Sequence, residues 1–254
     1  MCRAFFFKFL LILIFPFGMG INQSRAQGNE IVRLNEHFYP ISEKDTVNYF
    51  YKAIIVNFTD STSIERIFNL NNQIVKVTRY GYNQEGNFPE EITETYDSNG
   101  KLSSKKVKNR TNGFYQAVYF DKGEQLGEVL YQGENNFEIR APKSEEIKKA
   151  DENVFEPKPR LDKDLWIQTL KKNLSYPATA RRREEGTVIL AIYVNEFGER
   201  KAPVIANPEN VDRLLAEEAL RVVKYFDGEI APATTINGNT IDSWLYLPIH
   251  FMLD

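Results

Sequence analysis

The turns of this chain constrain its fold more than any other feature of the sequence. Asp97-Ser98-Asn99-Gly100 carries the Asn-Gly pair that is a strong signal for a tight β-hairpin. Asp121-Lys122-Gly123 repeats the sense of that turn 24 residues later, and Phe68-Asn69 begins a similar unit 28 residues before Asp97. Turns that recur at about 25 residues indicate an antiparallel meander. We therefore predict a β-rich domain over residues 27–140.

The segments between these turns have the composition of strands. Phe50–Val56 and Ile74–Tyr80 are rich in β-branched and aromatic residues, and Lys106-Val107-Lys108 alternates charged and apolar side chains as a sheet with one wet face does. Over about 80 residues the units resemble degenerate MORN-type hairpin repeats, which read aromatic, Asp, Gly, apolar. An ordinary antiparallel sheet with Gly, Asn and Asp turns explains the pattern equally well.

Residues 1–26 are predicted to form an export signal. Arg3 and Lys8 precede the apolar run Phe9–Phe17, which is too short to cross a bilayer but has the length of a signal-peptide core. Ser24-Arg25-Ala26 offers small residues at the −3 and −1 positions, so we place cleavage after Ala26 and predict a periplasmic protein. The alternative is an uncleaved inner-membrane anchor over residues 4–21.

Charge and composition exclude several classes of function. The formal net charge is −3, and the chain after residue 26 carries −6 because the first 26 residues hold three basic groups and no acid. No broad basic surface is available, so we predict no nucleic-acid partner. One cysteine and two histidines argue against a disulfide scaffold, a Cys-rich zinc site and a Cys/His protease. We predict no metal and no cofactor.

Residues 141–160 read as a linker between two domains. Pro142 closes the last β segment, the next residues are almost all polar or charged, and Glu156-Pro157-Lys158-Pro159-Arg160 favours an extended, solvated chain. A short surface helix over residues 144–151, with Ser144 as its N-cap, is the alternative for the first half of the linker.

Residues 161–254 combine helix and strand patterns. Leu161, Leu165, Trp166, Leu170 and Leu174 recur at helical spacing, a short second helix follows over residues 178–184, and the later helix carries the stripe Leu215, Ala219, Val222, Val223 and Phe226. Strands are expected at 187–194, at 201–206 and in the alternating last segment. We predict an α+β fold: a helix-strand-strand-helix-strand domain with an antiparallel sheet, preceded by the β-meander.

These residues resemble the C-terminal domain of the TonB energy-transducer family. The resemblance rests on six segments in the family's order: Tyr176-Pro177 with Ala180-Arg181, Gly186-Thr187-Val188, Val194 with Gly198, Glu218–Val223, Pro232-Ala233 with Asn237-Gly238, and Leu247-Pro248-Ile249 with Phe251. It implies that the domain captures a short segment of an outer-membrane β-barrel transporter along its last strand.

Two prolines indicate which strands lie at a sheet edge. Pro248 and Pro203 lack an amide hydrogen, so each belongs on an edge strand or at a bulge. An open edge allows β-strand addition, in which a guest peptide pairs with the free main chain. We predict that Trp244, Leu245, Tyr246 and Leu247 form the partner-binding segment. The alternative is that both leucines are core and that Trp244 and Tyr246 cover the other face.

We therefore predict an exported binding protein, not an enzyme, that engages an outer-membrane transporter or another envelope protein. A membrane-anchored transducer coupled to an inner-membrane motor complex is the alternative if the N-terminus is uncleaved, and a homodimer stays open. A hydrolase in the β-rich domain is the alternative of another class, and it would depend on His37. We interpret His250 as a strand residue, and the pairs Glu184-Glu185 and Glu217-Glu218 as solvated helix charges.

Overall fold

The computed structural model describes residues 29–142, 146–160, 163–177, 185–226 and 228–252. The predicted export signal at residues 1–26 and the predicted short helix at 178–184 lie outside the described residues. Within the described ranges, no helix has the length and apolar character needed to span a bilayer.

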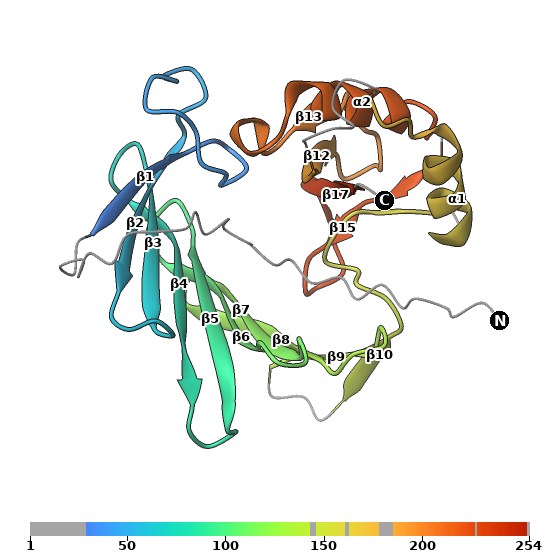
Figure 1. Cartoon of the computed structure of the whole chain (residues 1–254). Coiled ribbons are helices and arrows are strands. Elements are labelled where there is room, and N and C mark those ends of the chain that lie inside the picture. Colours follow the sequence, from blue (N-terminus) through green and yellow to red (C-terminus); the bar gives the residue numbers. More distant parts are fainter. Residues whose placement is uncertain (1–28, 143–145, 161–162, 178–184, 227, 253–254) are drawn as a thin grey trace.

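A single ten-stranded antiparallel sheet forms the first part of the chain. Its strands pair strictly in chain order, from β1 at one edge to β10 at the other. Figure 1 shows a curved sheet whose concave side faces the C-terminal part. The strands are β1 (Glu30–Leu34), β2 (Tyr51–Asn57), β3 (Ser63–Asn69), β4 (Ile74–Asn83), β5 (Phe88–Tyr96), β6 (Leu102–Asn109), β7 (Tyr115–Asp121), β8 (Glu124–Tyr131), β9 (Phe137–Arg140) and β10 (Ile147–Ala150).

The predicted hairpin turns are confirmed. Between β5 and β6, the carboxylate of Asp97 accepts hydrogen bonds from the main-chain N–H groups of Asn99 (2.9 Å) and Lys101 (2.8 Å). Gly100 adopts a φ of +74°, and Gly123 between β7 and β8 adopts +94°, which are values that residues with a Cβ rarely reach. The local turn chemistry therefore sets the hairpin positions.

The ten-stranded sheet is one layer thick over much of its length. Every residue of β5 is only half-buried, so neither face of that strand is sealed from water. A compact apolar cluster forms at the β1–β3 end, where Leu34, Ala53 and Ile67 are buried. The outer face carries cross-strand ion pairs such as Arg79–Glu94 at 2.8 Å. Sheet hydrogen bonding and cross-strand pairs, more than a deep core, hold the middle strands together.

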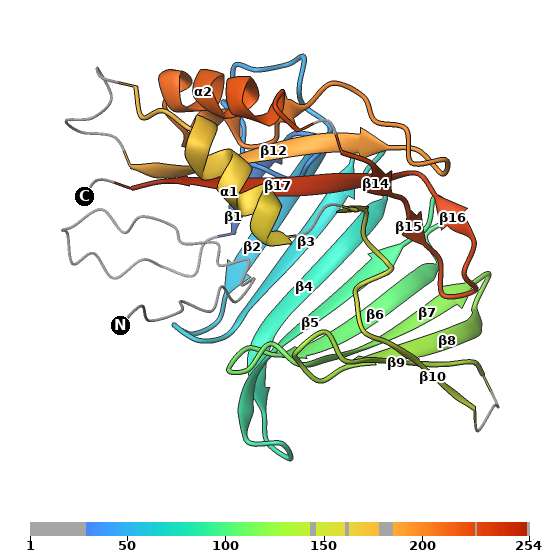
Figure 2. The ribbon, with the colours of Figure 1, turned by 90° about the vertical axis from the view of Figure 1, so that its right-hand side faces the viewer.

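The C-terminal part packs a three-stranded antiparallel sheet, in the order β13-β12-β17, against two helices (Figure 2). Its elements are β11 (Lys158–Pro159), α1 (Lys163–Asn173), β12 (Gly186–Val194), β13 (Val204–Ile205), the 3₁₀ turn η1 (Pro208–Asn210), α2 (Arg213–Val223), β14 (Ile230–Ala231), β15 (Ala233–Thr234), β16 (Thr240–Ile241) and β17 (Ser243–Phe251). β11 pairs with β14, and β15 pairs with β16.

Helix α2 and strand β12 confirm two of the sequence patterns. The carboxylate of Asp212 caps α2 by accepting from the Leu214 N–H at 2.8 Å. The predicted apolar stripe of this helix is buried against β12, whose residues Val188 and Leu190 are fully inaccessible to solvent. β12 is the central strand of its sheet, as its apolar character on both faces predicts.

The predicted α+β fold class is wrong. The described residues contain seventeen strands and two helices of 11 residues each, so the chain is mostly β and its C-terminal part is not a balanced α+β domain like that of the transducers. The error has a physical origin. The described helices form where the sequence patterns predict them, but strands also form where a linker or a loop was expected.

The predicted linker at 141–160 is the clearest such case. Residues 147–150 form β10 rather than the alternative surface helix, and they pair with β9. Residues 151–160, which we call the strap, cross to the C-terminal part. The carbonyl of Val154 accepts from the N–H (2.8 Å) and the hydroxyl (3.0 Å) of Thr234, and the ring of Phe155 stacks on Tyr119 at 5.8 Å. The strap is therefore held in place by both parts of the chain.

Candidate functional site

The candidate site is the outer edge of β17, the strand that carries all four predicted binding residues. β17 pairs along its whole length with β12, from Ser243 opposite Val194 to Phe251 opposite Gly186. In the described part of the chain, no strand pairs with its other side. β13 forms the opposite edge of the sheet with only two residues. The long open edge of this sheet is therefore that of β17.

Hydrogen bonds on β12 show which main-chain groups of β17 face outward. The N–H of Ile189 donates to the side chain of Asn207 and its carbonyl accepts from Ala206, both at 2.8 Å, so both groups point toward β13. Ile189 lies opposite Pro248, and this pair therefore makes no hydrogen bonds between β12 and β17. The missing N–H of Pro248 consequently falls on the open side, where it costs the sheet nothing.

The direction of the main-chain groups alternates from residue to residue, so the outward-facing groups of the rest of β17 can be identified too. Residues two apart point their N–H and C=O groups to the same side, so Trp244, Tyr246 and His250 share the outward direction of Pro248. Within the described residues, no hydrogen bond reaches these outward main-chain groups. The edge therefore offers three N–H donors and four C=O acceptors to a guest strand.

The side chains of the four predicted residues are used within the protein itself. Leu245 and Leu247 are buried in the core beneath α2. Trp244 and Tyr246 lie on the opposite face, where the ring of His37 packs edge-on against both, at 4.6 Å and 5.8 Å between centroids. This arrangement is the alternative stated for the sequence. The Tyr246 side chain is nevertheless 36% exposed, and the open edge also presents the main chain of β17.

The connection between β1 and β2 covers the Trp244–Tyr246 face. Asn35 anchors it: its amide donates to the carbonyl of Ala206 at 2.8 Å, and its side-chain oxygen accepts from the N–H groups of His37 and Tyr39 at 3.0 Å each. Asn35 and Tyr39 were not singled out in the sequence, because an Asn in a polar stretch gives no sign of a partner 171 residues away.

His37 is a packing residue of this contact. Its Nδ1 lies 3.3 Å from the hydroxyl of Tyr246, and its Nε2 is buried without a hydrogen-bond partner among the described residues. Burial lowers the pKa of the imidazole, against an opposing effect of Glu36. Burial also raises the pKa of Tyr246 to about 12, so its hydroxyl stays protonated.

The remaining titratable residues singled out in the sequence are structural. Nδ1 of exposed His250 lies 2.8 Å from the hydroxyl of Thr187, which agrees with a strand residue. Glu217 is solvated, as expected, but Glu218 is buried, so its interpretation as a solvated charge is wrong. The Glu218 carboxylate accepts from the Ser175 N–H at 2.6 Å and from Arg221 at 2.7 Å, and these bonds hold its pKa below the ordinary value.

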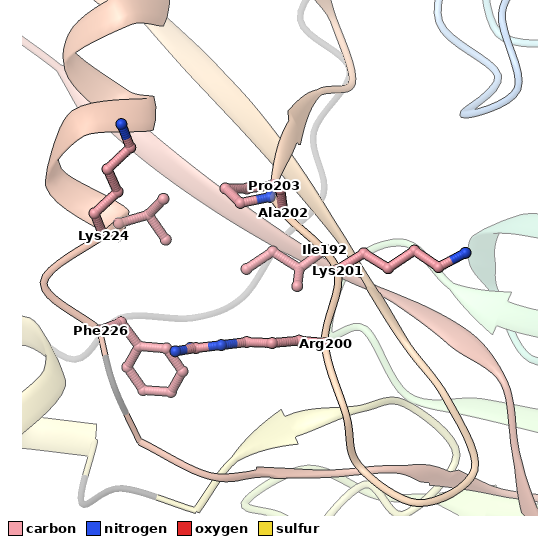
Figure 3. Close-up of a pocket in the computed structure, with 8 residues that line it drawn as sticks. Ile192, Arg200, Lys201, Ala202, Pro203, Lys224 and Phe226 are labelled. Carbon is pink, nitrogen blue, oxygen red and sulfur yellow. The ribbon is translucent and has the colours of Figure 1, made fainter.

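A pocket of about 260 Å³ lies between the connection from β12 to β13 and the C-terminal end of α2 (Figure 3). Arg200 extends across the ring of Phe226, 5.0 Å from its centroid, while the side chains of Lys201 and Lys224 point away from the centre. The lining holds no carboxylate, histidine, serine or cysteine. Its chemistry offers neither a nucleophile nor a general base.

No group of three or more His, Cys, Asp or Glu side chains that could hold a metal ion occurs among the described residues. Comparison with known proteins adds no relative: no family model, no curated protein and no solved structure matches this chain.

Proposed function

We propose that this protein binds an extended segment of a cell-envelope partner by β-strand addition to the open edge of β17. The observation that supports the proposal is the row of unpaired main-chain groups at Trp244, Tyr246 and His250, on a nine-residue strand that is buried on its inner face. Natural proteins cover or interrupt long open edges, because such edges attract other strands. An edge left open over this length is suited to capturing one.

The partner class follows from the sequence. Residues 161–254 resemble the C-terminal domains of TonB transducers, which implies a TonB-dependent outer-membrane transporter as the partner, and the signal-like N-terminus implies a periplasmic location. Pro248 bears on how a guest pairs, because a guest strand loses one hydrogen bond opposite it. We therefore expect the guest to pair with residues 243–247, which include the predicted binding segment.

Two variants of Tyr246 separate main-chain pairing from side-chain contact. Tyr246→Ala removes the ring and keeps the outward N–H, whereas Tyr246→Pro removes the N–H as well. The bonds to β12 come from the neighbouring residues, so both variants keep them. One hydrogen bond is worth about 1 kcal/mol, so we expect the proline variant to bind about 5-fold more weakly than the alanine variant.

The assay uses the full chain to capture outer-membrane proteins and then measures the affinity of the recovered transporter for wild type and both variants. Equal affinities of the alanine and proline variants would contradict strand addition at this edge. Recovery of no β-barrel transporter would remove the proposed partner class. N-terminal sequencing of the exported protein tests the location, because a start at Gln27 confirms cleavage and excludes an anchored transducer.

A further inference from the structure

The concave face of the ten-stranded sheet carries a polar patch that the proposed strand addition does not use. The pairing register places Thr78, Thr93, Lys106 and Ala117 in one row across β4 to β7. The next row is Tyr80, Glu91, Lys108 and Tyr115, and the preceding row ends in Ser104 and Tyr119. Because paired residues of antiparallel strands share a face, these side chains all lie on the concave side of the sheet, where Thr78 and Ala117 are buried.

Lys106 lies at the centre of this patch. Its lateral neighbours, Thr93 and Ala117, have small side chains, and its Nζ lies 5.0 Å from the centroid of the Tyr115 ring. Lys106 is half-buried, and within the described residues its ammonium group has neither a hydrogen-bond partner nor a carboxylate within 4 Å. Burial lowers the pKa of Lys106. A half-buried cation that forms no ion pair favours an anionic ligand.

Two tyrosines of β7 lie next to Lys106 in the sheet. Tyr115 and Tyr119 are diagonal neighbours of Lys106 across the β6–β7 pair, and neither hydroxyl makes a hydrogen bond within the described part of the chain. Burial raises the pKa of both phenols, so they remain protonated donors. One ammonium and two hydroxyls are the donor set that a carboxylate accepts from.

The charges facing the patch come from β3, β4, β5, β6, the turn after β6 and the strap. Lys76 and Arg110 lie on the β4 side and just after β6, and Lys108 follows Lys106 on the same strand. The opposing carboxylates on the sheet are Glu65 and Glu91, and Glu156 of the strap faces Lys106, Tyr115 and Tyr119 without forming an ion pair with Lys106. The balance of four cations and three carboxylates leaves room for one further negative group beside Lys106.

We propose that the patch around Lys106 binds a carboxylate of the guest strand, so that the preferred guest is an extended acidic peptide. This inference rests on strand addition to β17. Figures 1 and 2 agree that β17 is the strand of the three-stranded sheet that lies nearest the concave face. A strand added to β17 extends that sheet by about 4.8 Å toward the patch. The proposal requires that a Glu side chain of this added strand reach Lys106.

The test uses two blocked nine-residue peptides, Thr-Glu-Val-Glu-Val-Glu-Val-Glu-Thr and the same sequence with Gln in place of Glu. Their affinities for the full chain are measured by calorimetry, and amide shifts of β17 are followed by NMR. We expect the Glu peptide to bind at least 10-fold more tightly and Lys106→Met to reduce that ratio to about 2-fold or less. Lys105→Met is the matched control, because Lys105 is the preceding residue of β6 and lies on the opposite face; it should leave the ratio unchanged.

The outcomes separate the two proposals. If both peptides shift the Tyr246 amide and bind equally well, strand addition stands and the carboxylate site is refuted. If neither peptide shifts the β17 amides, strand addition itself fails. A loss of the preference in Lys105→Met as well as in Lys106→Met would also refute the site, since it would point to general charge attraction. Lys106→Arg should retain the preference, and its amide spectrum shows whether the fold is intact.

Discussion

The side chain of Asn207 hydrogen-bonds to the main chain of β12 on the side that faces β13, and its removal should measurably lower the stability of the fold. β13 pairs with β12 over two residues only, and the side chain of Asn207 continues the pairing beyond them. Its Oδ1 accepts from the Ile189 N–H at 2.8 Å, and its Nδ2 donates to the Thr187 carbonyl at 2.8 Å. Asn207→Ala leaves both groups without a partner.

The expected loss follows from the burial of these groups. An unsatisfied buried donor costs about 1–3 kcal/mol, and Ile189 is buried. The half-buried Thr187 carbonyl can recover a bond to water, so it contributes less. We expect the free energy of unfolding to fall by about 2–3 kcal/mol, which lowers the melting temperature by about 4–12 °C for a chain of this size.

Urea unfolding followed by circular dichroism measures the change, and hydrogen exchange of the Ile189 amide localises it. Asn210→Ala is the matched control, because Asn210 lies three residues on in η1 and is exposed. A loss below about 0.5 kcal/mol in Asn207→Ala, or an Ile189 amide that exchanges as slowly as in wild type, would refute the reasoning.

Three further predictions concern other buried contacts. Glu218→Gln should destabilise the fold by about 1–2 kcal/mol at pH 7. Because folding lowers the pKa of Glu218, wild type loses this advantage as the pH falls below 4.5 and through the folded pKa. Urea titrations at a series of pH values should show the difference in stability shrinking over that range. Gly198→Ala should cost more stability in thermal melts than Gly238→Ala, since both have φ above +80° but only at Gly198 would a Cβ lie 2.6 Å from the Ile230 carbonyl. Folding lowers the pKa of His37, so the imidazole takes up a proton at a higher pH in the unfolded chain than in the folded one. As the pH falls from 6.5 to the folded pKa, wild type should therefore lose stability that His37→Phe keeps. Parallel pH profiles of stability for the two proteins would contradict this.

Helices and strands whose own residues follow a clear pattern could be predicted from the sequence. The apolar character of residues 187–194 on both faces predicted a central strand, and the stripe from Leu215 to Val223 predicted α2. Pro248 placed the last strand at an edge because a proline cannot donate to a neighbour. Pro203 carried the same signal, and only the brevity of β13 shows that β17 has the long edge.

Contacts between distant polar residues could not be predicted. The strap appeared to be a solvated linker because its composition is charged and Pro-rich, but the partner of Val154 lies 80 residues further on. The roles of Asn35 and Glu218 likewise depend on hydrogen bonds to Ala206 and Ser175, which are far away in the sequence. The fold class was wrong for a related reason, because strands of two to four residues such as β10 have too few residues to show a period.

The strictly sequential pairing of the ten-stranded sheet has a consequence for how this region can change length. Each inner strand bonds only to the strands before and after it in the chain, so stability adds up from neighbour to neighbour as in a repeat array. A whole hairpin can therefore be inserted or deleted without changing how the other strands pair with one another. Under tension the array would peel open one strand at a time, with many small steps instead of a single rupture.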